Sequence, residues 1–200
     1  MRLAVVEHGH APAEAAMLEE IRTRSGAEPL GVVKTLLYRP ELFGTPFSST
    51  LDRAMRGPSD WSAGERELFA GFTSLLNQCP FCTGSHGAVA SYALGEEVWD
   101  AVVADWRTAP IRPELAATLV FLEKLTLRPE ELGPADADAV RAAGVSEEAL
   151  RTAATVCSLF SMIVRLADSF GWDVPAWDRL QQRAPAMLEG GYVLGAIRTR

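Results

Sequence analysis

The chain has 200 residues, enough for one domain with a sizeable core. Its 48% hydrophobic and 22% charged residues are ordinary for a soluble globular protein and exclude a disordered chain. Nineteen Lys and Arg against 26 Asp and Glu give a formal charge of −7, which argues against a nucleic-acid partner, and three cysteines are too few for a disulfide scaffold.

Helical periodicity runs along most of the chain, and no useful stretch alternates with period two. The pattern therefore predicts an all-α fold. The predicted helices, in chain order, cover residues 12–25, 29–38, 41–55 with a break at Pro46, 62–77, 79–95, 97–107, 113–127, 136–143 and 146–170.

Three local features refine these boundaries. Ser62 and Glu65 have the spacing of a capping box, which predicts a helix start. Pro80 directly after Cys79 suits the first turn of the next helix. The tail after Pro185 is rich in glycine, and we interpret it either as an arm that packs on a partner subunit or as a frayed end.

Charged residues are absent from 68–95 and from 152–164. The second run is too short to cross a bilayer, and the first contains Asn77, Gln78, Pro80 and His86. Both runs are interpreted as buried helices of a soluble core, with no membrane partner. The N-terminal apolar run stops at Glu7, so no signal-peptide core is present and a cytoplasmic location is expected.

One segment carries the clearest chemistry, with the pattern C-x-x-C-x-x-x-H formed by Cys79, Cys82 and His86. At a helix start both sulfurs lie near the positive end of the dipole, which favours thiolates. Cys82 and His86 lie one turn apart on one helix face, so the imidazole can accept the Cys82 proton. Cys79 and Cys82 are spaced to form a disulfide, which indicates a redox pair.

Glu67 on the preceding helix is the last charge before the uncharged run, so partial burial is expected. A carboxylate there can hold His86 in one tautomer and raise its basicity. Small residues on both helices predict close packing: Ala70, Gly71 and Ser74 on the first, and Gly84, Gly87 and Ala88 on the second.

Other interpretations of these residues remain open. The cysteine pair can be structural, or Cys79, Cys82 and His86 can bind zinc, although a fourth ligand is missing nearby. Glu67 can be a solvated charge on a helix face. Cys157 lies in the middle of an apolar helix and is interpreted as a small core residue. We expect no metal and no cofactor.

Glu67, Cys79, Cys82 and His86, with eleven residues between Glu67 and Cys79, resemble the signature of alkylhydroperoxidase D-like proteins of the carboxymuconolactone decarboxylase superfamily. The resemblance covers residues 40–171, which predicts a core between an N-terminal helical extension (1–39) and a C-terminal tail or arm (172–200). It implies an oligomeric helical bundle, as a dimer, trimer or hexamer. It also implies that Cys82 attacks the peroxide, that Cys79 then forms a disulfide with the oxidised Cys82, and that Glu67 and His86 relay protons. One departure is Phe81, where well-studied members have His.

The sequence thus predicts a thiol-dependent peroxidase that reduces alkyl hydroperoxides, an antioxidant dithiol–disulfide oxidoreductase. Its expected partners are a hydroperoxide substrate and an external dithiol of thioredoxin or lipoyl type. The first alternative is a carboxymuconolactone decarboxylase-like enzyme in which Glu67 and His86 perform acid–base chemistry without redox sulfur. The second is a non-enzymatic helical oligomer that responds to zinc or redox state.

Overall fold

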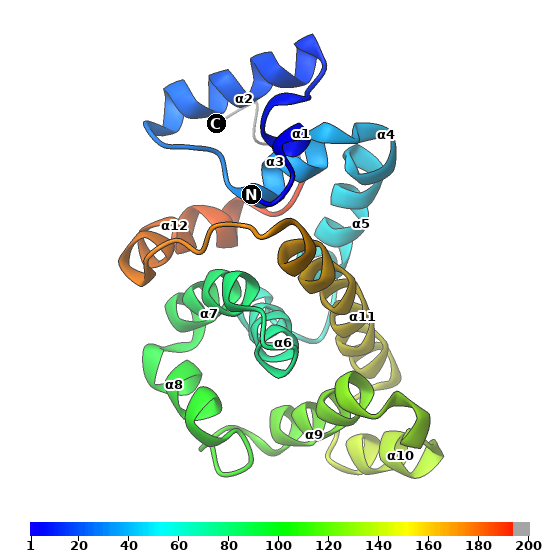
Figure 1. The fold of residues 1–200 in the computed structure, drawn as a ribbon. Coiled ribbons are helices and arrows are strands. Elements are labelled where there is room, and N and C mark those ends of the chain that lie inside the picture. The colour runs from blue at the N-terminus through cyan, green and yellow to red at the C-terminus, as the bar shows by residue number, and fades with distance from the viewer. Residues whose placement is uncertain (194–200) are drawn as a thin grey trace.

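The computed structural model describes residues 1–193, which form helices and connecting turns without a β-strand (Figure 1). The all-α prediction is therefore confirmed. The helices are α1 (Ala4–His8), α2 (Pro12–Ser25), α3 (Gly31–Tyr38), α4 (Pro40–Phe43), α5 (Thr45–Arg56), α6 (Ala63–Leu76), α7 (Pro80–Leu94), α8 (Glu96–Asp105), α9 (Pro113–Leu127), the short 3-10 helix η1 (Pro129–Glu131), α10 (Pro134–Ala142), α11 (Glu147–Phe170) and α12 (Trp177–Gly190).

Two features differ from the sequence prediction. The break expected at Pro46 lies instead at Gly44. Pro46 occupies the first turn of α5, where backbone N–H groups make no hydrogen bond within the helix, so a proline is compatible with the helix there. The helices α1 and α12 were not predicted, since the first is very short and the second contains Pro185. Part of the predicted arm therefore forms α12, whereas residues 194–200 lie outside the described part of the chain.

Helix α6 lies at the centre of the fold, with α7, α8, α9 and α11 around it (Figure 1). The predicted capping box begins this helix: the Ser62 hydroxyl accepts from the Glu65 amide, and the Glu65 carboxylate accepts from the Ser62 amide. The uncharged run 68–95 occupies most of α6 and α7 and is largely buried. This central position explains why charges are missing from the run.

The crossing of α6 and α7 depends on two glycines that face the buried Trp99 of α8. A Cβ added to Gly87 would lie 2.4 Å from the Trp99 ring, and one added to Gly71 would lie 2.9 Å from it. The Gly71 position is also 3.3 Å from the Gly87 backbone nitrogen. The predicted close packing of small residues is therefore confirmed at this crossing.

Replacing Gly87 by Ala should destabilise the protein by about 1–3 kcal/mol, because the rigid indole of Trp99 cannot withdraw from the new methyl group. The matched control is Gly84→Ala in the same helix, where the new Cβ would meet only one tip of the Leu180 side chain, at 3.0 Å. Urea unfolding should show a clear loss for Gly87→Ala and a smaller loss, or a gain from helix propensity, for Gly84→Ala. Equal stability of the two variants would contradict this account of the crossing.

Helix α11 contains the second uncharged run and packs against α6, α9 and α5. Cys157 is fully buried in it, and its sulfur lies 3.3 Å from the Thr126 hydroxyl of α9, so its position in the core agrees with the prediction. Among the described residues α11 is the one helix long and apolar enough to cross a membrane, but half of its apolar window is buried within the protein. Core helices of soluble proteins pass the same test, so this is weak evidence for a membrane span.

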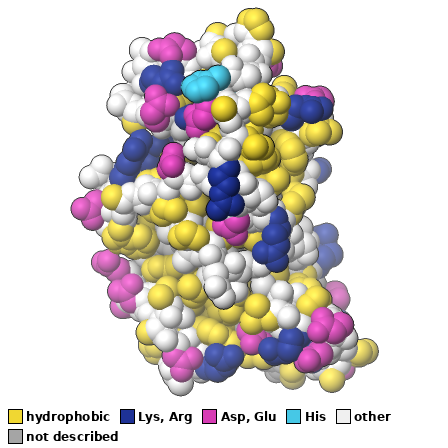
Figure 2. Space-filling model, viewed as in Figure 1, with side chains coloured by type: hydrophobic (Ala, Val, Ile, Leu, Met, Phe, Trp, Pro, Cys, Tyr) yellow, Lys and Arg dark blue, Asp and Glu magenta, His cyan; other side chains and the backbone are white. Residues whose placement is uncertain are grey.

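The N-terminal helices cover the end of α11. Leu18, Leu36 and Leu37 form a small apolar cluster of their own, and Thr35 accepts a hydrogen bond of 2.9 Å from the Trp172 indole. The division into residues 1–39, 40–171 and 172–200 stays a prediction. On the face shown in Figure 2, acidic and basic side chains are interspersed, without a large patch of one sign.

Candidate active site

Glu67 and His86 meet where α6 packs against α7. Glu67 Oε2 lies 2.7 Å from His86 Nδ1, and the two residues are 0% and 5% exposed. The predicted contact between the two side chains is therefore present, and Glu67 is buried more completely than expected. The interpretation of Glu67 as a solvated charge is wrong.

The Glu67 carboxylate is surrounded by donors from three parts of the chain. Arg56 Nη2 donates to Oε1 at 2.5 Å, and the Tyr192 hydroxyl donates to the same oxygen at 2.7 Å. Burial raises the pKa of Glu67, but the hydrogen bond with His86 and the charges of His86 and Arg56 outweigh burial and lower it below its usual value. The carboxylate is therefore ionised at neutral pH.

This arrangement fixes the tautomer of His86. An ionised carboxylate only accepts hydrogen bonds, so the hydrogen of a neutral His86 is on Nδ1, facing Glu67. The other ring nitrogen, Nε2, then carries a lone pair that can accept a proton. The Phe160 ring packs edge-on against the imidazole at 4.4 Å and restricts its orientation.

Cys79 and Cys82 lie at the start of α7 as free, buried thiols. The hydrogen bond from Cys82 lowers the pKa of Cys79, and the Cys82 backbone N–H at the helix start adds to this effect. The pKa of Cys82 is raised, because it shares this hydrogen bond with Cys79 and is deeply buried. The lowered pKa of Cys79 agrees with the expected thiolate at a helix start, and the raised pKa of Cys82 does not.

The four predicted residues form two pairs: Cys79 with Cys82 at the start of α7, and Glu67 of α6 with His86 one turn further along α7. Within residues 1–193, no hydrogen bond joins His86 to either sulfur. Asp168 of α11 faces both thiols, where its negative charge raises the pKa of each. Proton transfer from Cys82 to His86 therefore requires a side-chain movement or a bridging molecule.

The residue between the two cysteines belongs to the core. Phe81 is 5% exposed and packs edge-on against Trp172, with ring centroids 5.1 Å apart. Between its two cysteines this chain therefore has an apolar contact with the segment after α11. Residue 81 cannot exchange protons with the thiols.

Sequence reasoning missed Arg56 and Tyr192. Arg56 ends α5, and Tyr192 follows α12 in the glycine-rich tail, so neither belongs to the motif. A possible signal was the Gly-Gly pair before Tyr192, which permits a sharp turn back toward the core.

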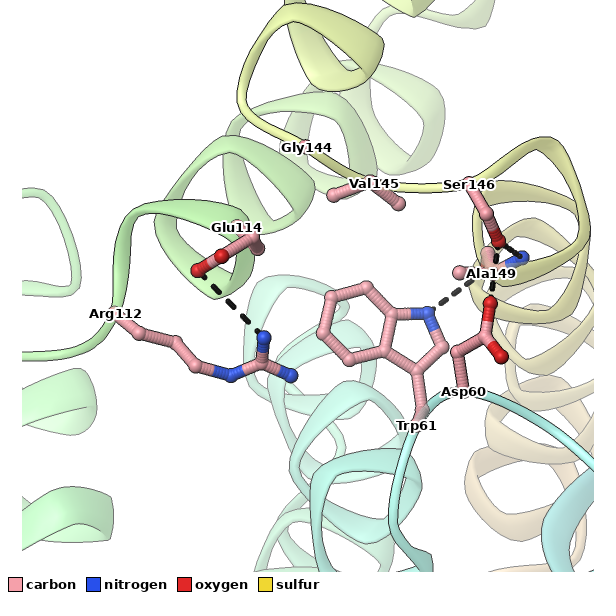
Figure 3. Close-up of a pocket in the computed structure, with 8 residues that line it drawn as sticks. All are labelled: Asp60, Trp61, Arg112, Glu114, Gly144, Val145, Ser146 and Ala149. Carbon is pink, nitrogen blue, oxygen red and sulfur yellow. Dashed lines mark hydrogen bonds and ion pairs between the residues drawn. The ribbon is translucent and has the colours of Figure 1, made fainter.

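The cavity in Figure 3 lies away from these residues. It has a volume of about 240 Å³ and is lined by Asp60, Trp61, Arg112, Glu114, Gly144, Val145, Ser146 and Ala149. Its polar groups are largely paired: the Trp61 indole donates to the Ala149 carbonyl at 2.8 Å, and Ser146 donates to Asp60 at 2.5 Å. Among residues 1–193, no group of three or more His, Cys, Asp or Glu side chains is arranged to hold a metal ion.

Comparison with known proteins defines the class of this fold. No family model and no curated protein matches the chain. A solved structure described as an alkylhydroperoxidase AhpD core, an uncharacterized peroxidase-related protein from Ralstonia eutropha JMP134, matches with a TM-score of 0.73 and 27% identity, over 86% of this chain and 90% of that one. An uncharacterized peroxidase-related protein from Silicibacter sp. TM1040 matches with a TM-score of 0.72 and 25% identity, over 83% and 86%.

The fold is thus that of the peroxidase-related helical proteins. The resemblance to alkylhydroperoxidase D-like proteins of the carboxymuconolactone decarboxylase superfamily is confirmed.

Proposed function

We propose that this protein is a thiol peroxidase that reduces alkyl hydroperoxides with the Cys79–Cys82 pair. The observation that carries the proposal is the pair of free thiols, Cys79 and Cys82, at the start of α7, one turn from the buried Glu67–His86 pair. The peroxidase-related solved structures with this fold support the class of activity. Retention of two adjacent thiols favours it over acid–base chemistry alone.

The proposed first step is deprotonation of Cys82 by His86 Nε2, after a side-chain movement or through a bridging molecule, with the imidazolium stabilised by Glu67. The Cys82 thiolate attacks the terminal, hydrogen-bearing oxygen of the hydroperoxide, the O–O bond breaks, and the alkoxide takes the proton from His86 to leave as the alcohol. Cys82 is now a sulfenic acid. In the resting protein the pKa of the Cys82 thiol is raised, so formation of its thiolate depends on His86 as the base.

The second step forms the disulfide. The Cys79 thiolate, favoured by the helix start, attacks the Cys82 sulfur, the S–O bond breaks, and hydroxide leaves and is protonated to water. An external dithiol of thioredoxin or lipoyl type then reduces the disulfide by thiol exchange and becomes oxidised itself. We place the protein in the cytoplasm, where such donors keep thiols reduced, and propose that it works as a homo-oligomer.

The test is mass spectrometry of intact and digested protein after one equivalent of an alkyl hydroperoxide. We expect the loss of two hydrogens and a peptide linked through Cys79 and Cys82, with Cys157 remaining free because its sulfur contacts the Thr126 hydroxyl rather than another thiol. The control is a sample blocked with a thiol-alkylating reagent before peroxide is added. Unchanged thiols after peroxide treatment, or a disulfide that includes Cys157, would contradict the proposal.

A further inference from the structure

We infer that Tyr192, from the segment after α12, is a positioning residue that sets the pH at which the Glu67–His86 pair acts as a base. The inference deepens the proposed function by adding a residue to the same site. It starts from a hydroxyl that reaches a buried carboxylate 125 positions away in the chain.

The end of α12 is held against α5 so that Tyr192 points inward. Arg56 donates to the carbonyl oxygens of Leu188 at 2.9 Å and Met187 at 3.1 Å. The chain then turns at Gly191, where φ is +66° and an added Cβ would lie 2.2 Å from Asp52 Oδ1. The same Asp52 oxygen accepts the Tyr192 backbone N–H at 2.7 Å. Only glycine fits this turn, so the position of the tyrosine is built into the fold.

The Tyr192 side chain contacts both members of the pair. Its hydroxyl donates to Glu67 Oε1 at 2.7 Å and lies 3.2 Å from His86 Nδ1. Its ring is nearly parallel to the imidazole, with centroids 6.2 Å apart, and the Arg56 guanidinium lies 5.1 Å from its centroid. Burial and the charge of Glu67 raise the pKa of Tyr192 well above its usual value, so the hydroxyl keeps its proton and remains a donor.

The two oxygens of Glu67 therefore have different hydrogen-bond partners. Oε1 accepts from Arg56 and Tyr192, and Oε2 is left for His86. Each donor to a buried carboxylate favours its ionised form and weakens its hold on a shared proton. Without the hydroxyl, the pair should bind its proton more tightly and become a base only at higher pH.

Other ionisable groups lie on the helices around the pair, and the removal of one hydroxyl leaves them in place. They are Arg56 and Asp52 from α5, Arg66 from α6, Cys79 and Cys82 from the start of α7, and Asp168 from α11. Arg66 is held by the carbonyl oxygens of Ala54 and Gly57, and Asp168 faces the sulfurs. Tyr192→Phe removes one donor and leaves the ring against Arg56, so a change in titration reports the hydroxyl.

The experiment is a pH titration of the His86 ring signals by NMR in the full-length protein, with the signals assigned by their loss in His86→Gln. In Tyr192→Phe the midpoint of the pair should move up by about one pH unit. The matched control, Tyr92→Phe, removes a hydroxyl from a tyrosine that is 57% exposed and should leave the midpoint unchanged. Peroxide turnover below the midpoint should fall about tenfold in Tyr192→Phe and recover at high pH.

A second variant guards against a folding defect. Gly191→Ala displaces the same hydroxyl by blocking the turn against Asp52 and should raise the midpoint as well. An unchanged midpoint in both variants overturns the inference, as does an equal shift in Tyr92→Phe. A shifted midpoint in a protein that never turns over peroxide refutes the proposed function and leaves the role of Tyr192 standing, because the titration requires no substrate.

Discussion

Replacing Cys82 by Ser is expected to reduce peroxide turnover about 10³-fold or more. A serine hydroxyl is far less acidic and less nucleophilic than a thiol, so the O–O bond loses its attacking group. The fold should persist, because the substitution is nearly isosteric within the first turns of α7. Turnover is measured with an alkyl hydroperoxide and a small dithiol reductant, and circular dichroism confirms folding.

Two further variants separate the roles of the sulfurs. Cys79→Ser should also lose turnover, but its Cys82 should still react once and give a sulfenic acid that a dimedone-type reagent labels. Cys157→Ser is the control, since that thiol is buried on α11 and should leave turnover unchanged. The pKa of Cys79 is lowered and that of Cys82 is raised, so attack by Cys79 is the alternative order to test. In that order, a dimedone-type reagent would label Cys79 in the Cys82→Ser variant. That label would contradict attack by Cys82.

Local sequence signals predicted the part of the fold that carries the motif. The Ser62–Glu65 capping box and the Cys79-Pro80 step are local, and α6 and α7 begin where these signals place them. Pro46 was misread because a proline breaks a helix interior but is compatible with a first turn, and the sequence alone left these two cases unresolved. Helix α12 forms despite Pro185, packed against α7.

The site was only partly predictable, for a different reason. Glu67 and His86 lie on sequential helices joined by a tight turn, so their spacing implied contact. Arg56 and Tyr192 reach Glu67 through tertiary packing, and no periodicity links position 192 to position 67. The order of the thiol pKa values also required structure, because it depends on which sulfur accepts the hydrogen bond at the helix start. The sequence thus indicated the groups that we propose to react, and the fold supplies donors that act on the charge of Glu67.

Replacing Glu67 by Gln is the second change expected to have a large effect on peroxide turnover, because Arg56 and Tyr192 donate to this carboxylate. Arg56 can only donate hydrogen bonds, so the amide oxygen of Gln must face Arg56 and Tyr192. The amide NH₂ group then faces His86 Nδ1 and donates to it, which moves the imidazole hydrogen to Nε2. A ring protonated on Nε2 cannot accept the Cys82 proton, so peroxide turnover should fall about 10²- to 10⁴-fold.

The tautomer itself is measurable, which separates this mechanism from a general loss of stability. Nitrogen-15 shifts of His86 should report hydrogen on Nδ1 in the native protein and on Nε2 in Glu67→Gln. The control Glu123→Gln makes the same change at a glutamate that is 8% exposed on α9, where it pairs with Arg128, and should leave both the tautomer and turnover unchanged. Each variant should lose about 1–3 kcal/mol of stability, because each replaces a largely buried carboxylate that binds arginine. Native turnover in a Glu67→Gln protein with the inverted tautomer would show that His86 is not the base, and the Cys82 proton would then have to leave by another route.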